Sequence, residues 1–114
     1  MTLREKQSLF VVLVARLIQY ATALGYELSW GETYRSPEEA ERLARNNPGA
    51  AIKRSLHCDR LAVDLNLFKD GRYLTSTESH RPLGEWWERQ HELCRWGGRF
   101  DDGNHYSLEH GGRK

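Results

Sequence analysis

The chain contains little of what disulfide-stabilised, membrane-spanning or secreted proteins are built from. Its 114 residues include two cysteines, Cys58 and Cys94, whose spacing fits neither a zinc ribbon nor a redox pair. We therefore expect two free thiols and a reducing compartment. The longest apolar run near the start, residues 9–15, is broken by Arg16 and is too short to span a bilayer. It also lacks a convincing cleavage site, so we expect neither a secretory signal nor a stable membrane association.

Charge of one sign is not in excess either. Seventeen Lys and Arg residues face 16 Asp and Glu residues, which gives a formal net charge of +1. No global field then favours a nucleic acid or a membrane surface, and we expect no nucleic-acid partner. The length is that of a single domain covering residues 1–114. Hydrophobic residues make up 39% of the chain, with four Trp and five Tyr, which is enough for a modest core.

Periodicity and turn signals predict a mixture of helices and strands. Apolar residues at helical spacing predict a helix over residues 3–24, ended by Gly25. A second helix is predicted to begin at Ser36-Pro37-Glu38-Glu39, which combines a serine cap, a first-turn proline and a capping-box glutamate. This helix should run to about Arg45 and end at Asn46-Asn47-Pro48-Gly49. The other predicted elements are strands at 26–30, 61–68, 73–74 and 105–110, an Asp-Gly hairpin turn at 69–72, and a helix at 81–95 opened by Pro82 and stopped by Gly97-Gly98. This pattern indicates the α+β class.

The stretch from Ser55 to Asp64 carries the clearest functional signal. In the alternating strand 61–68, Leu61, Val63, Leu65 and Leu67 share one face, and Asp64 lies on the other. An ionised carboxylate in a half-buried strand is costly unless a positive or hydrogen-bonding group meets it. His57 precedes the strand, and a histidine presented together with a carboxylate suggests a metal. The alternative is that Asp64 pairs with an arginine or caps a loop and that His57 is a surface histidine.

A catalytic zinc site needs a third ligand, and two segments offer a histidine three residues after an acid. Glu88 and His91 fall inside the predicted helix, where such a pair is ordinarily solvated. Asp102 and His105 fall in a glycine-containing turn that leads into a strand, where two side chains can be aimed at one point. We favour the second pair. We expect His80, His91 and His110 on the surface or in support of a ligand.

At these positions the sequence resembles the zinc D-Ala-D-Ala metallopeptidases, which include dipeptidases, carboxypeptidases and the L-alanyl-D-glutamate peptidase endolysins of phages. The family motif Ser-x-His-x-x-Gly-x-Ala-x-Asp is matched by Ser55, His57, Ala62 and Asp64, and the acid-x-x-His motif by Asp102 and His105. Arg35 matches an arginine on the strand before the first motif. Arg60 replaces the motif glycine, from which we expect a relaxed loop or a charged group at the cleft rim.

The resemblance implies a small antiparallel sheet flanked by helices, of the Hedgehog/D-Ala-D-Ala peptidase type, with the site in a groove on one sheet face. It implies Zn²⁺ held by His57, Asp64 and His105. Asp102 is then the general base, and Arg35 polarises the scissile carbonyl and stabilises the oxyanion. Ser55 is a weaker candidate, as a residue that binds the substrate carboxylate or supports a ligand.

The activity that the resemblance implies is hydrolysis of peptidoglycan stem peptides. An L-alanyl-D-glutamate endopeptidase acting as a phage endolysin fits best, because the aspartate at position 102 looks more like the endolysins than the dipeptidases. We expect a monomer that accumulates in the host cytoplasm and reaches the cell wall with the help of a holin-like factor. The alternatives are a D-Ala-D-Ala carboxypeptidase or dipeptidase and, in another class, a non-catalytic zinc-containing wall-binding or structural phage protein.

Overall fold

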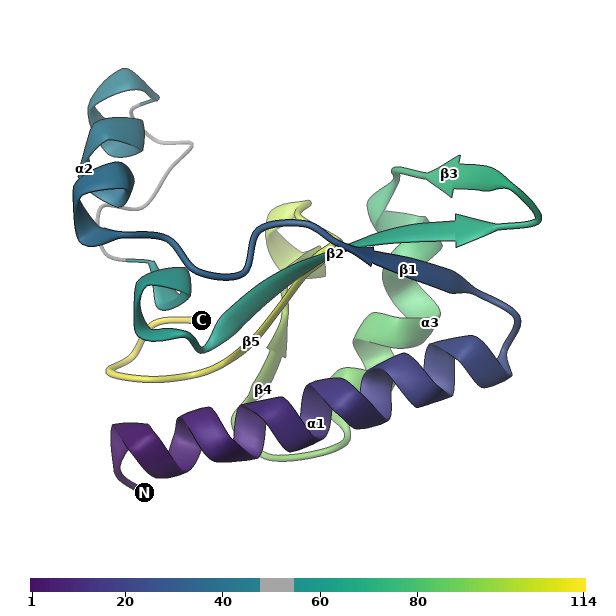
Figure 1. The fold of residues 1–114 in the computed structure, drawn as a ribbon, viewed down its shortest axis with the longest axis horizontal. Coiled ribbons are helices and arrows are strands. Elements are labelled where there is room, and N and C mark those ends of the chain that lie inside the picture. The colour runs from purple at the N-terminus through teal and green to yellow at the C-terminus, as the bar shows by residue number, and fades with distance from the viewer. Residues whose placement is uncertain (48–54) are drawn as a thin grey trace.

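A long strand, β2 (Ala62–Lys69), lies at the centre of an antiparallel sheet in the computed structural model, which describes residues 1–47 and 55–114 (Figure 1). The first half of β2 pairs with β5 (His105–Leu108), and β4 (Cys94–Trp96) continues the sheet beyond β5. The second half pairs with β1 (Glu27–Trp30) and, through a tight turn, with β3 (Arg72–Leu74). The result is the predicted α+β class, a small antiparallel sheet flanked by helices.

The alternation along β2 places the core on one face of the sheet, as the sequence predicts. Leu61, Val63, Leu65 and Leu67 are all at most 3% exposed, whereas Asp64, Asn66 and Phe68 on the other face are partly exposed. The long helix α1 (Leu3–Ala23) covers the core face with an apolar stripe that includes Phe10, Leu13 and Leu17. Because Leu17 is fully buried, its replacement by Ala should lower the free energy of unfolding by about 2–5 kcal/mol.

The chain between β1 and β2 includes the helix α2 (Pro37–Asn46), which projects away from the sheet in Figure 1. The predicted serine cap is present, because the Ser36 hydroxyl accepts a hydrogen bond from the Glu39 amide at 3.0 Å. Pro48 and Gly49, the expected end of this helix, lie outside the described residues. Arg35 was expected at the end of a strand, but β1 ends at Trp30 and Arg35 lies in the connection to α2.

The predicted helix over residues 81–95 is wrong at both ends. Helix α3 runs from Thr77 to Glu88, with the Ser76 hydroxyl accepting a hydrogen bond from the Ser79 amide and with Pro82 inside the helix. Residues 94–96 form β4, because pairing with β5 and burial of the Cys94 and Trp96 side chains outweigh the helical period of the sequence. The helix therefore stops well before Gly97-Gly98, which belong instead to the 3₁₀ helix η2 (Gly97–Phe100).

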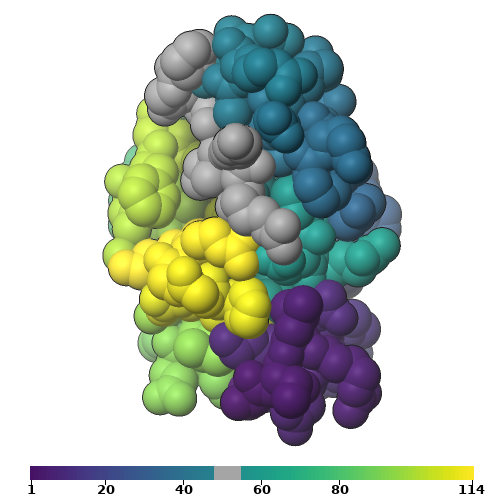
Figure 2. Space-filling model, turned by 90° about the vertical axis from the view of Figure 1, so that its left-hand side faces the viewer, coloured from purple at the N-terminus to yellow at the C-terminus, as the bar shows by residue number. Residues whose placement is uncertain are grey.

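The C-terminal segment lies beside the start of α1 on the face shown in Figure 2. There the Lys6 ammonium donates to the carbonyl oxygen of Glu109 and approaches His110 Nδ1 at 3.0 Å. Strand β5 ends at Leu108, two residues earlier than predicted, and His110 forms an isolated bridge with Arg113. Cys58 and Cys94 are free thiols, as expected, and both are buried. Among residues 1–47 and 55–114, no helix combines the length and the apolar composition that a membrane crossing requires.

Candidate metal centre

His57 lies in a single 3₁₀ turn, η1 (Leu56–Asp59), just before β2. The Ser55 hydroxyl caps this turn by accepting a hydrogen bond from the His57 amide at 3.1 Å. Ser55 is buried, so this hydroxyl supports the histidine backbone from within the protein. The imidazole is also buried, and its Nδ1 lies 3.1 Å from the carbonyl oxygen of Thr33. A carbonyl oxygen only accepts, so Nδ1 carries the proton and Nε2 presents a lone pair to the site.

Arg60 ends the same turn in the left-handed conformation, with φ of 57° and ψ of 36°. This is the backbone region that glycine adopts freely and that other residues adopt at a cost of about 1–2 kcal/mol. The arginine at the motif glycine position therefore keeps the tight turn, and the expected relaxed loop is not formed. Its guanidinium lies over the ring of Tyr34, 4.2 Å from the ring centre, which places a positive charge beside the turn.

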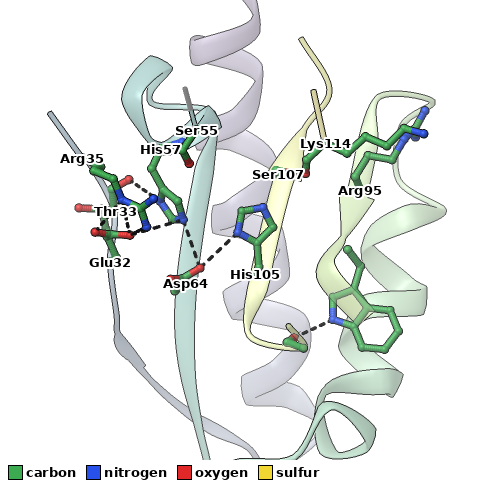
Figure 3. A network of polar contacts seen from close by, with 12 residues as sticks. Glu32, Thr33, Arg35, Ser55, His57, Asp64, Arg95, His105, Ser107 and Lys114 are labelled. Atoms are coloured by element: carbon green, nitrogen blue, oxygen red, sulfur yellow. Dashed lines mark hydrogen bonds and ion pairs between the residues drawn. The ribbon is translucent and has the colours of Figure 1, made fainter. Parts of the chain in front are cut away.

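Asp64 and His105 meet because they are directly opposite each other in the register of β2 and β5. Directly paired residues of antiparallel strands point to the same face of the sheet, here the face away from the core. His105 Nδ1 lies 3.3 Å from Asp64 Oδ1, and His57 Nε2 lies 3.3 Å from the same oxygen (Figure 3). The three predicted ligands thus converge on one point, with their ligand atoms all within 4.8 Å of one another.

The donor set and its spacing fit zinc. Ligand atoms that bind zinc tetrahedrally at about 2.0–2.1 Å lie about 3.3–3.4 Å apart, which is the spacing that Asp64 Oδ1 keeps from both imidazole nitrogens. Asp64 Oδ1 is buried, and no group of the described residues donates a well-directed hydrogen bond to it. A buried carboxylate oxygen faced by two imidazole nitrogens needs a cation among them. Two histidines and a carboxylate could hold zinc and leave a fourth position open.

The pKa values of Asp64 and His57 also indicate that the cluster favours a bound positive charge. Burial alone would raise the pKa of Asp64, but the nearby His105 and His57 imidazoles outweigh it and hold the pKa at about 2. Burial would likewise lower the pKa of His57, but Asp64, the Thr33 carbonyl and Glu32 together raise it. Without a metal the site therefore attracts a proton. Zinc and protons compete for the same lone pairs, so zinc binding should release protons and weaken in acid.

Arg35 stands beside the cluster on the connection after β1. Its backbone amide donates to the His57 carbonyl oxygen at 3.3 Å. Its guanidinium donates from Nε to both carboxylate oxygens of Glu32, at 3.1 and 3.2 Å, and also contacts Glu32 through Nη2. The hydrogen bond to Glu32 raises the pKa of Arg35 against the opposing effect of burial, and Asp64 raises it further. The Nη1 group makes no hydrogen bond or ion pair with another described residue, so it can serve an incoming carbonyl.

Glu32 is the residue that the sequence reasoning missed. Besides binding Arg35, it lies 3.8 Å from His57 Nε2, at the edge of the candidate metal cluster. The only signal in the sequence is its spacing of three residues from Arg35, which is too common to indicate a site. The contact arises because the chain beyond β1 continues along β2, with the Asp64 amide donating to the Glu32 carbonyl oxygen at 2.8 Å.

Asp102 lies in the turn between η2 and β5, three residues before His105, whose amide donates to the Asp102 carbonyl oxygen at 3.1 Å. The residue is exposed, but neighbouring protein atoms desolvate its carboxyl group, and this raises its pKa. The charges of His105, Asp64, His57 and Arg35 also act on this carboxyl group. Its turn packs closely on Gly97, where an added Cβ would lie 2.2 Å from the Asp102 carbonyl oxygen.

The alternative pair, Glu88 and His91, does not form a site. Helix α3 ends at Glu88, and the two residues are engaged separately: Glu88 accepts from the Trp96 amide at 3.3 Å, and His91 Nδ1 accepts from the Leu93 amide at 3.1 Å. His80 was expected on the surface or in support of a ligand, and it takes neither place. His80 is 2% exposed, and its Nδ1 is hydrogen-bonded to the Tyr106 hydroxyl at 2.8 Å.

A solved structure shares this fold. It is the crystal structure of the Serratia marcescens L-Ala D-Glu endopeptidase ChiX, which matches with a TM-score of 0.66 and 24% sequence identity. The match covers 85% of this chain and 77% of that chain. No family model matches the sequence, and no curated protein matches it. At this level of identity the likeness shows the fold, and the chemistry has to be argued from the residues of this chain.

Proposed function

We propose that residues 1–114 form one peptidase domain that hydrolyses the stem peptides of bacterial peptidoglycan, with zinc bound by His57, Asp64 and His105. The observation that carries this proposal is the buried Asp64 Oδ1, which lies 3.3 Å from each of two imidazole nitrogens and receives no well-directed hydrogen bond from the described residues. The fold shared with an L-Ala D-Glu endopeptidase and the aspartate at position 102 support the bond between L-Ala and D-Glu as the one that is cut.

In this proposal the metal, Asp102 and Arg35 each have a separate role in the hydrolysis. Zinc, when bound, supplies the Lewis acidity that makes a water molecule a competent nucleophile near neutral pH. Asp102 accepts the proton of the attacking water, and its raised pKa suits a general base. The same carboxyl group then gives the proton to the nitrogen of the leaving amine. Arg35, held by Glu32 and kept charged, donates from Nη1 to the carbonyl oxygen as negative charge develops there.

The test is to digest purified peptidoglycan with the zinc-loaded protein and to identify the new termini by mass spectrometry. The proposal expects peptides that begin with a free D-glutamate amino group. Asp102→Asn should keep its zinc and lose roughly a hundredfold or more in rate, because it cannot accept the proton. Release of D-alanine would instead show a D-Ala-D-Ala carboxypeptidase. If the protein binds wall and zinc without making any new terminus, the non-catalytic alternative is correct.

We further propose that this activity serves a phage endolysin, a monomer that accumulates in the host cytoplasm until a holin-like partner gives it access to the wall. The aspartate at position 102 supports this assignment, because the resembling endolysins use an aspartate at that place. The proposal expects that cells producing the protein lyse only when their membrane is permeabilised. Lysis of cells with an intact membrane would contradict it.

A further inference from the structure

A polar pocket of about 180 Å³ lies beside the candidate metal centre, on the side of Asp102. Its walls include Asn66, Tyr73, Thr77, Asp101, Asp102 and Asn104. Asn66 follows Asp64 by two residues on β2, so the two side chains point to the same side of the strand. Asp102 belongs both to the pocket and to the surroundings of the metal cluster. The pocket therefore borders the candidate site at Asp102.

The charge of this pocket is negative. Two carboxylates, Asp101 and Asp102, line it, and no lysine or arginine among the described residues does. His80 also lines it, but burial holds the pKa of this imidazole at about 4, so it adds no positive charge at neutral pH. A group that enters the pocket thus meets two negative charges and several hydroxyl and amide groups. Such a lining favours an ammonium group and opposes a carboxylate.

Asp101 is held in place for such a contact. Its backbone takes the left-handed conformation, with φ of 55°, and its amide donates to the Gly98 carbonyl oxygen at 3.2 Å. Asp101 Oδ1 accepts a hydrogen bond from the Thr77 hydroxyl at 2.8 Å, at the first turn of α3. Within the described residues, Asp101 Oδ2 has no hydrogen-bond partner. One carboxylate oxygen is thus anchored, and the other is available to a ligand.

The turn that carries Asp101 is itself rigid. A Cβ added at Gly103 would lie 2.5 Å from the Thr77 Cα atom, so the turn packs directly on the start of α3. The Trp96 indole donates to the Gly103 carbonyl oxygen at 2.7 Å from the other side. A pocket whose walls are fixed before the ligand arrives loses little conformational entropy on binding.

The direction of the bound peptide follows from the role of Asp102, so this step rests on the proposed function. Asp102 gives its proton to the leaving amine, and the leaving half of the substrate therefore lies on the Asp102 side, where the pocket is. After a cut between L-Ala and D-Glu, that half continues from D-Glu to a diamino acid. We propose that the polar pocket binds the side-chain ammonium group of this diamino acid, with Asp101 as the residue that determines the preference.

Two synthetic peptides test this inference, L-Ala–γ-D-Glu–L-Lys and the same peptide with norleucine in place of lysine. Norleucine keeps the carbon chain and removes the amine. The zinc-loaded wild type should cut the lysine peptide about tenfold better in kcat/KM, the size expected for one charge-assisted hydrogen bond in a partly desolvated pocket. Asp101→Asn should cut the norleucine peptide as the wild type does and lose most of the preference for lysine.

Asparagine is a conservative change at this position, because it tolerates the left-handed conformation and its carbonyl oxygen can still accept from Thr77. Asp70→Asn is the matched control. Asp70 has φ of 52° and lies in the turn after β2, outside the pocket, so this variant should keep the full preference. If the wild type cuts both peptides equally well, or if Asp101→Asn keeps the preference, the inference is wrong and the proposed function stands. If the wild type cuts neither peptide, both are wrong.

Discussion

Acidification should destabilise the fold through His80, the buried histidine that links α3 to β5. The unfolded chain takes up a proton at this residue below about pH 6.5, whereas the folded protein resists protonation until about pH 4. In the folded state the imidazole is 2% exposed and hydrogen-bonded to the Tyr106 hydroxyl at 2.8 Å, so a proton added to it would place a charge in a desolvated site. Stability is therefore fully present above pH 6.5 and is lost as the pH falls towards 4. A shift of about 2.5 units corresponds to about 3 kcal/mol.

Urea unfolding of metal-free protein between pH 7 and pH 4.5 measures this loss, with His80→Gln as the comparison. The other titrating groups, among them His57 and Asp102, are common to both proteins and cancel in the difference. The free energy of unfolding of the wild type should fall by about 2 kcal/mol more than that of His80→Gln over this range, because His80 is still largely neutral at pH 4.5 in the folded state. If the two proteins lose stability in parallel, His80 titrates normally and the reasoning from its burial is refuted.

Two further predictions concern the surroundings of the metal centre. Arg35→Lys should keep the zinc and lose roughly a hundredfold in kcat, because a lysine cannot bind Glu32 through a planar fork and also reach the substrate. If steady-state kinetics show an unchanged kcat, Arg35 takes no part in the chemistry. Gly97→Ala should lower the free energy of unfolding by about 1–3 kcal/mol, since the Cβ of the alanine would lie 2.9 Å from the His105 Cβ. If urea unfolding shows no change in this free energy, the turn relaxes around the added methyl group.

Local patterns were sufficient to predict the positions of two residues of the candidate site. The alternation of residues 61–68 predicted both the buried face of β2 and the position of Asp64 on the opposite face, and the structure has both. His57 could be predicted because it lies close to Asp64 in sequence and precedes the strand directly. His105 could be proposed only as one of two candidates, since its position opposite Asp64 depends on the pairing register of β2 with β5.

The errors have a common cause in contacts between distant parts of the chain. Residues 94–96 have the spacing of a helix, but pairing with β5 and burial of Trp96 against Gly84 make them a strand, and helix α3 is shorter and earlier than predicted. Glu32 was missed because its contacts with Arg35 and His57 follow from the path of the chain after β1. His80 was expected on the surface or in support of a ligand because nothing in its sequence neighbourhood indicates the buried contact with Tyr106.

The central claim is that His57, Asp64 and His105 together hold one zinc ion. The most direct measurement is the zinc content per chain of the purified wild type, of His105→Ala and of His91→Ala. The account predicts one zinc per chain in the wild type and in His91→Ala, and none in His105→Ala, because two remaining ligands do not hold zinc tightly. If His105→Ala keeps its zinc, or if the folded wild type binds none when zinc is supplied, the metal centre is not where this account places it.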